Sequence, residues 1–151
     1  MNPVLDRLVL LFFVLALSGC ADFGSPQPSA ETSPACPKEA PTLMAEARLY
    51  FGRGLSGGGE VSARDWQAFL DTTVTPLFPD GFTVLNGSGQ WLSDRHDRVI
   101  SENSKVLVVL VGKSDETRAN LKQVAQAYAR RFDQEAVGLS LKPACVGWIG
   151  P

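Results

Sequence analysis

The chain has 151 residues, of which 44% are hydrophobic, and its 14 Lys and Arg residues nearly balance its 16 Asp and Glu residues. That length allows one ordinary domain and leaves little for a second. The formal net charge of -2 argues against the strongly basic surface of nucleic-acid-binding proteins, so we expect no nucleic-acid partner. The apolar content excludes a chain that is disordered throughout.

The first twenty residues resemble the signal peptide of a bacterial lipoprotein. Residues 8–17 are apolar and follow Arg7. A helix of ten residues rises about 15 Å, roughly half the thickness of a bilayer core, which fits a signal peptide better than a membrane span. The next residues, Leu17-Ser18-Gly19-Cys20, resemble the lipobox, in which the cysteine becomes the first mature residue and is acylated on sulfur.

We therefore expect residues 1–19 to be a signal peptide and Cys20 to carry acyl chains such as palmitate. Two or three acyl chains give a stable anchor, so membrane lipid is the first expected partner. In a Gram-negative cell, Ala21 lacks the aspartate associated with inner-membrane retention, which favours the outer membrane, facing the periplasm. The alternative is a secreted protein whose signal peptide happens to end in cysteine.

Residues 20–44 are expected to form a tether between the lipid and a domain over residues 45–151. Five of the ten prolines lie between residues 21 and 43, with three serines and no apolar periodicity. This composition favours extended, polyproline-like conformations. At about 3.1 Å per residue, the tether could reach roughly 70 Å from the lipid.

Cys36 and Cys145 are the two cysteines outside the lipobox. In an exported chain, such a pair indicates one disulfide formed in an oxidising compartment. The alternatives are metal binding and redox catalysis. However, the chain has no C-x-x-C motif, and its single histidine, His96, cannot complete a zinc site with two thiols without carboxylate help. We expect no metal and no cofactor.

The first half of the domain is interpreted as strand, helix and strand. The short segment of residues 48–51, which is rich in aromatic residues and is followed by Gly52, predicts a first strand. Ser62, with Asp65 three residues on, predicts a helix start, and Thr75-Pro76 its end. Residues 82–85 predict a second strand that resumes at residues 90–92, and residues 93–98 a polar hairpin tip. The buried face of the helix is predicted from apolar residues at helical spacing, Trp66, Phe69, Leu70 and Val74.

The second half is interpreted as strand, helix and strand again. Residues 105–111 are apolar on both faces, which is typical of a central strand covered on both sides. Ser114 is expected to cap a second helix with acidic residues in its first turn. Alternating apolar residues from Val137 to Leu141 predict a last strand that Pro143 interrupts. The expected inner stripe of the second helix is Leu121, Val124, Ala125, Tyr128 and Phe132.

This order predicts an α+β fold, a ferredoxin-like βαββαβ sandwich with an antiparallel sheet and both helices on one face. The first and last strands are then neighbours, which brings Cys36 close to Cys145. Because the helices cover one face while residues 105–111 are apolar on both, we expect a second copy of the chain on the other face, as a homodimer.

Three short motifs match chemical signatures, but plain structural interpretations fit them better. Residues 52–57 match G-x-G-x-x-G, yet the predicted helix starts too late to place its amides on a pyrophosphate. Residues 54–58 match G-x-S-x-G, yet the domain is too small for an α/β-hydrolase. Residues 94–98 offer two carboxylates and an imidazole, but their two arginines oppose a metal cation. We expect a flexible glycine loop and a solvated hairpin tip.

A set of aromatic and polar side chains lies near predicted strand ends and on the first helix. Aromatic walls with a few polar groups are typical of small-molecule clefts. Trp66, at helical spacing, also fits the core, and Glu102 with Lys105 also fits a simple ion pair. The candidate ligand-binding residues are Tyr50, Trp66, Gln90, Trp91, Glu102 and Lys105, and no catalytic residue is assigned.

Residues 48–146, approximately, resemble a bacterial family described as domain of unknown function 3574. The resemblance implies a small exported protein, in many members a lipoprotein, and it implies no established activity. It rests on blocks in a fixed order, namely Leu49-Tyr50-Phe51-Gly52, Val61-Ser62, Trp66-Gln67-Ala68-Phe69-Leu70, residues 74–81, Gly89-Gln90-Trp91, Ser104-Lys105-Val106-Leu107 and residues 128–132.

The sequence therefore predicts a cell-envelope lipoprotein whose domain is a non-enzymatic module that binds an envelope protein or a small ligand. The alternative is a small enzyme with its active site on the open sheet face of a ferredoxin-like dimer. Convergence of Tyr50, Gln90, Glu102 and Lys105 on one cleft would keep the enzyme possible. Side chains that point apart into solvent would exclude it.

Overall fold

A computed structural model describes residues 35–151, so the predicted signal peptide, Cys20 and most of the predicted tether lie outside the described residues. No helix within residues 35–151 has the length and apolar character needed to cross a membrane. The elements in chain order are β1 (Thr42–Gly52), α1 (Ala63–Phe69), the π-helical turn η1 (Leu70–Val74), α2 (Thr75–Leu77), β2 (Thr83–Ser93), β3 (Arg98–Val111), α3 (Asp115–Arg131) and β4 (Gly138–Val146).

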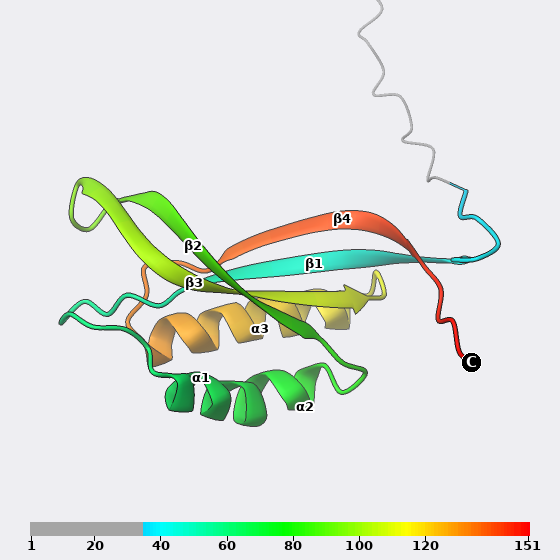
Figure 1. Cartoon of the computed structure of the whole chain (residues 1–151), viewed down its shortest axis with the longest axis horizontal. Coiled ribbons are helices and arrows are strands. Elements are labelled where there is room, and N and C mark those ends of the chain that lie inside the picture. The colour runs from blue at the N-terminus through cyan, green and yellow to red at the C-terminus, as the bar shows by residue number, and fades with distance from the viewer. Residues whose placement is uncertain (1–34) are drawn as a thin grey trace, which may run out of the picture. The chain divides into compact units, whose positions relative to one another are not determined.

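The four strands form one antiparallel sheet in the order β2-β3-β1-β4. Figure 1 shows the helices on one side of this sheet, and no helix of residues 35–151 covers the other side. The predicted ferredoxin-like α+β fold is therefore confirmed. The apolar run at residues 105–111 belongs to β3, which is an inner strand as predicted.

Three strands are longer or more continuous than predicted. The first begins at Thr42 rather than residue 48, and β3 begins at Arg98 rather than residue 105. The second does not break at residues 86–89, because every residue of β2 pairs with β3 as far as Ser93 opposite Arg98. Pairing with a neighbouring strand here overrides the weak strand preference of Asn, Gly and Ser.

Pro143 does not interrupt the last strand, contrary to the prediction. β4 runs from Gly138 to Val146, and Pro143 lies opposite Ala45 of β1. β4 is an edge strand that pairs only with β1. A proline is tolerated at such an edge, where its missing N–H can face away from the sheet.

The first helix also continues past the predicted end at Thr75-Pro76. It starts as predicted, because the Ser62 hydroxyl accepts a hydrogen bond from the backbone N–H of Asp65 at 3.1 Å. The turn then widens in η1, where the N–H of Thr75 donates to the carbonyl of Leu70. Pro76 consequently falls in the first turn of α2, where its missing N–H costs little.

The core between sheet and helices is built around an aromatic cluster. Tyr128 of α3 packs edge-on against Phe51 of β1, with ring centroids 4.7 Å apart. Trp66 and Phe69 complete the cluster from α1. The predicted stripe of α3 lies on this side, with Leu121, Val124 and Tyr128 buried and with Ala125 and Phe132 partly buried.

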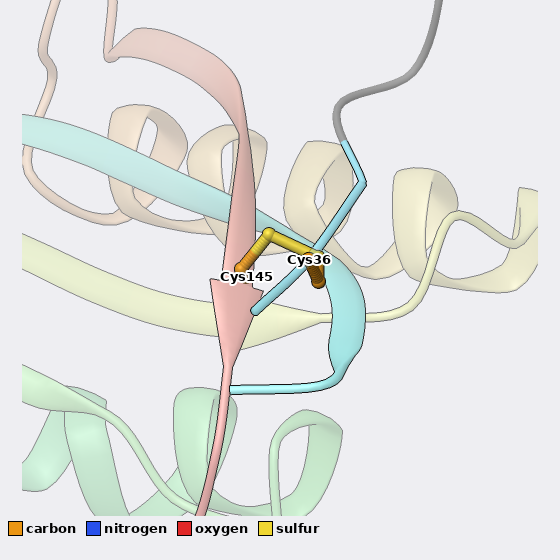
Figure 2. Close-up of a disulfide and its surroundings, with 2 residues drawn as sticks. All are labelled: Cys36 and Cys145. Atoms are coloured by element: carbon orange, nitrogen blue, oxygen red, sulfur yellow. A yellow bond between two sulfur atoms is a disulfide. The ribbon is translucent and has the colours of Figure 1, made fainter. Parts of the chain in front are cut away.

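Cys36 and Cys145 form the predicted disulfide, with their Cα atoms 5.5 Å apart (Figure 2). Cys36 precedes β1 and Cys145 lies at the end of β4, so the bond links the segment before β1 to the C-terminal end of β4, the strand paired with it. Gly147, which follows β4, also lies against this segment, because a Cβ at Gly147 would clash with the carbonyl oxygen of Glu39. The chain entering β1 is therefore fixed against the chain leaving β4.

The sheet face away from the helices is partly apolar, with half-buried Met44, Val106, Val108 and Leu110. An ion-pair group lies among them, in which Glu46 contacts Arg48 at 2.7 Å and Lys142 at 3.1 Å. Hydrogen bonds from these two cations hold the pKa of Glu46 below its usual value. The second copy expected on this face stays a prediction.

Candidate functional site

The carboxylate of Glu102 joins three segments of the fold. Its Oε1 accepts a hydrogen bond from the indole Nε1–H of Trp91 at 2.7 Å, and its Oε2 accepts one from the backbone N–H of Gly54, also at 2.7 Å. Glu102 lies on β3, Trp91 on β2, and Gly54 in the glycine-rich loop that follows β1. Both carboxylate oxygens are therefore fixed in position by neutral donors.

Two glycines make the space for this carboxylate. A Cβ at Gly52 would lie 2.5 Å from Oε1 of Glu102, and a Cβ at Gly54 would lie 3.1 Å from Oε2. Real Cβ atoms essentially never approach oxygen as closely as the first distance, so a side chain at Gly52 would move the carboxylate away. These are the first two glycines of the G-x-G-x-x-G match, and the structure shows that they accommodate the Glu102 carboxylate.

The peptides of the two glycines are themselves held from the core and from the segment after α3. The hydroxyl of Tyr128 donates to the carbonyl of Gly52 at 2.8 Å, and burial raises the pKa of that hydroxyl. The side-chain amide of Gln134 donates to the carbonyl of Gly54 at 2.7 Å. The start of the loop is thus fixed by hydrogen bonds, although the sequence predicted a flexible glycine loop.

Glu102 lines two neighbouring cavities that both include Trp91. The first, which we call the Tyr50–Trp91 cavity, has a volume of about 260 Å³. The second, the hairpin-tip cavity, has a volume of about 200 Å³ and lies against the β2–β3 turn. The Tyr50–Trp91 cavity is lined by Tyr50, Gly52, Gly89, Gln90, Trp91, Glu102, Ser104, Gln134, Ala136 and Gly138.

The register of the strands explains why the side chains of Tyr50, Trp91 and Glu102 lie on the same face of the sheet. Core residues Leu49 and Phe51 of β1 face the helices, so Tyr50 between them faces the other side of the sheet. Glu102 lies opposite Gly89, and Trp91 is two residues further along β2, on the same face as Gly89. The Tyr50–Trp91 cavity therefore lies on the sheet face that the helices leave open.

The hairpin tip is held to the segment after α3 by polar contacts. The buried hydroxyl of Ser93 donates to Glu135 at 2.6 Å, and Arg95 contacts Asp133 at 3.1 Å. The Ser93 hydrogen bond, followed by the backbone N–H of Arg95, holds the pKa of Glu135 below its usual value. Within residues 35–151, no three His, Cys, Asp or Glu side chains are grouped so as to hold a metal ion.

The structure brings four of the six candidate ligand-binding residues around one cavity, namely Tyr50, Gln90, Trp91 and Glu102. Trp66 lies elsewhere, because it is only 4% exposed and belongs to the aromatic core. Lys105 also lies elsewhere and donates to the side-chain oxygen of Asn86. Residues three apart on a strand face opposite sides of the sheet, which separates Lys105 from Glu102.

Three residues that belong to this site were not among the candidates, namely Gly52, Gly54 and Gln134. The G-x-G pair at the end of the first strand carried a usable signal, since closely spaced glycines can mark a close approach of another group. The identity of that group depends on strand register, which the sequence does not give. Gln134 follows the second helix and carries no pattern of its own.

A model of the family described as "Protein of unknown function (DUF3574)" matches residues 46–148. Among solved structures, the chain is similar to a phage SAM lyase in complex with S-methyl-5′-thioadenosine, with 13% identity, a TM-score of 0.56, and coverage of 71% of this chain and 93% of that chain. It is also similar to a phage SAM lyase in the apo state, with 15% identity, a TM-score of 0.51, and coverage of 72% and 94%. At these identities the likeness is one of fold alone. Comparison with curated proteins finds no match.

Proposed function

The chain belongs to the DUF3574 family of proteins of unknown function, and on that premise we propose that it is a non-enzymatic binding module that holds a small ligand in the Tyr50–Trp91 cavity. The observation that supports this most is the Glu102 carboxylate, which two neutral hydrogen bonds fix in the cavity wall. Tyr50 and Trp91 beside it are 42% and 38% exposed, so their rings are available for contact. A few fixed polar groups among aromatic walls orient small ligands in proteins.

Chemical-shift mapping tests this proposal. The full chain, ¹⁵N-labelled in an uncharged detergent, is titrated with a library of small polar and charged compounds. We expect a subset to shift the Trp91 indole N–H and the side-chain amides of Gln90 and Gln134, while the amides of α2 stay unchanged. A library that leaves these three side chains unperturbed would overturn the proposal.

We further propose that acylation of Cys20 holds this domain at a cell membrane, on the outer membrane facing the periplasm in a Gram-negative host. The apolar residues 8–17 followed by Leu17-Ser18-Gly19-Cys20 support this. Expressed in bacteria fed a clickable palmitate analogue, the wild-type chain should take up label and fractionate with membranes. Cys20→Ser should do neither, whereas Cys36→Ser should still be labelled. Label on Cys20→Ser would contradict the assignment.

An enzyme is the second candidate, and the fold shared with a phage SAM lyase favours it. The criterion for an enzyme was that four residues converge on one cleft. Three of them line one cavity, namely Tyr50, Gln90 and Glu102, and Lys105 does not. The test is incubation of the purified chain with S-adenosylmethionine and chromatography for S-methyl-5′-thioadenosine. If the protein is a non-enzymatic module, the wild-type chain should form no more S-methyl-5′-thioadenosine than the Glu102→Gln variant. Turnover that Glu102→Gln abolishes would establish the enzyme instead.

A further inference from the structure

The charged residues in the wall of the Tyr50–Trp91 cavity are all of one sign. Its lining, all within the described residues, includes one carboxylate, that of Glu102, and no Lys, Arg or His side chain. The hairpin-tip cavity, which also includes Trp91, differs, since Arg95, His96 and Arg98 line it together with acidic residues. The Tyr50–Trp91 cavity therefore carries the formal negative charge of the Glu102 carboxylate, whereas the lining of the hairpin-tip cavity has charges of both signs.

No cation of the described part of the chain compensates this carboxylate by direct contact. The ion pairs over residues 35–151 involve other acids, namely Glu46, Glu60, Asp115, Asp133 and Glu135. The two groups that hold Glu102, an indole N–H and a peptide N–H, are both neutral. A negative charge in this position attracts a positively charged ligand.

Aromatic rings in the same cavity favour an organic cation over a metal ion. The faces of tryptophan and tyrosine attract cations, and recognition of quaternary ammonium groups between such rings is a known use of this effect. Tyr50 and Trp91 are the two aromatic residues of the lining. A metal ion would need several ligands, and Glu102 is the one His, Cys, Asp or Glu residue in the lining of this cavity. A volume of about 260 Å³ suits a small group and not a dinucleotide.

We propose that the Tyr50–Trp91 cavity binds a small alkylated organic cation, an ammonium or sulfonium compound, with Glu102 as the counter-charge and Tyr50 and Trp91 as its aromatic walls. This inference rests on the proposed binding function and names the class of ligand. The rest of the lining carries no further charge, and it includes the neutral polar residues Gln90, Ser104 and Gln134.

The test compares two ligands of nearly equal shape. Choline and 3,3-dimethylbutan-1-ol differ in that a carbon of the alcohol replaces the charged nitrogen. Each is titrated into the full ¹⁵N-labelled chain in a maltoside detergent, with the Trp91 indole N–H as reporter, assigned by its loss in Trp91→Phe. We expect choline to bind at least about tenfold more tightly than the alcohol.

Variants separate charge at the site from charge elsewhere. Glu102→Gln should weaken choline binding about tenfold and should leave binding of the alcohol within about twofold. Glu116→Gln, on the exposed first turn of α3, removes the same charge outside both cavities and should bind choline like the wild type. The amide spectrum of each variant verifies that it is folded.

The outcomes distinguish this inference from the proposed function. The proposal that the ligand is a cation would be overturned if choline and its neutral counterpart bound equally, or if Glu102→Gln left choline binding unchanged. Either result would still leave a binding site for other small molecules. Failure of these probes and of the wider library to perturb the cavity would overturn both.

Discussion

Glu102 shows how a single side chain depends on residues that have no side chain at all. Its two oxygens accept hydrogen bonds from Trp91 and Gly54, and the room for them exists because position 52 is glycine. Hydrogen bonds to a charged group contribute more to stability than neutral ones, about 1.5–3 kcal/mol each. The position of this carboxylate is therefore sensitive to a methyl group placed next to it.

We predict that Gly52→Ala keeps the fold but displaces the Glu102 carboxylate. The added Cβ would lie 2.5 Å from Oε1, and the flexible end of the glutamate is what moves. Loss of one of its two hydrogen bonds should lower the free energy of unfolding by about 1.5–3 kcal/mol, measured by urea denaturation, and the displaced carboxylate should shift the Trp91 indole resonance. Gly57→Ala, in the same loop with open space around its Cβ, is the control and should change neither quantity. An unshifted indole resonance in Gly52→Ala would contradict the geometry.

At the scale of elements, the β2–β3 hairpin and the segment after α3 depend on each other. The buried Ser93 hydroxyl and the backbone N–H of Arg95 both donate to Glu135, and the Arg95 side chain contacts Asp133. These contacts close one side of the hairpin-tip cavity. The hairpin tip was expected to be solvated, and its side chains are largely exposed, but it is held in place through Glu135.

This arrangement predicts a pH-dependent contribution from Glu135. Its pKa is lower in the folded protein than in the unfolded chain, because Ser93 and Arg95 stabilise the charged form. The stability that Glu135 contributes is thus present above about pH 4.5 and is lost as the pH falls through the lowered folded-state pKa. Urea denaturation of the wild type and Glu135→Gln should show a gap at pH 7 that narrows in acid. Asp94→Asn, in the same tip, is the control and should produce no such gap, and a gap for Glu135→Gln that is equal at both pH values would contradict the prediction.

At the scale of the whole molecule, the disulfide connects the start of the domain to its end. Cys36 and Cys145 are 109 residues apart in sequence, and the bond encloses nearly the whole fold. In the chain-entropy model, a loop of that length lowers the entropy of the unfolded chain enough to contribute about 4–5 kcal/mol. The bond also holds Cys36, near the start of the described residues, at the end of the domain where β4 finishes.

We predict that the Cys36→Ser/Cys145→Ser double variant folds to the same structure but is less stable by about 4–5 kcal/mol. Guanidinium denaturation of the oxidised protein, the reduced protein and the double variant measures this. The reduced wild type should match the variant, since both lack the bond. Equal stability of the oxidised protein and the variant would show that the loop closure contributes nothing.

Local patterns in the sequence were sufficient to predict the order of the elements, the caps at Ser62 and Ser114, and the βαββαβ topology. Those features depend on periodicity and on neighbours a few residues away, as with Asp65 beside Ser62. Strand lengths were not predictable, because the ladder between β2 and β3 continues through Asn86 and Gly87, where local preference favours a turn. The effects of Pro76 and Pro143 were predicted wrongly for the same reason. The π-helical turn before Pro76 and the edge position of Pro143, which let each proline stay within its element, exist only in the folded chain.

The sequence by itself was enough to predict that the domain is ferredoxin-like and that Cys36 pairs with Cys145, because these are the two cysteines outside the lipobox and the predicted topology brings them together. It also drew attention to Tyr50, Gln90, Trp91 and Glu102 as separate candidates. Only the tertiary structure decided that these four share a cavity while Trp66 and Lys105 do not. The physical reason is register: which residues of β1, β2 and β3 lie opposite one another is set by long-range pairing, and a shift of one residue would turn Glu102 to the other face of the sheet.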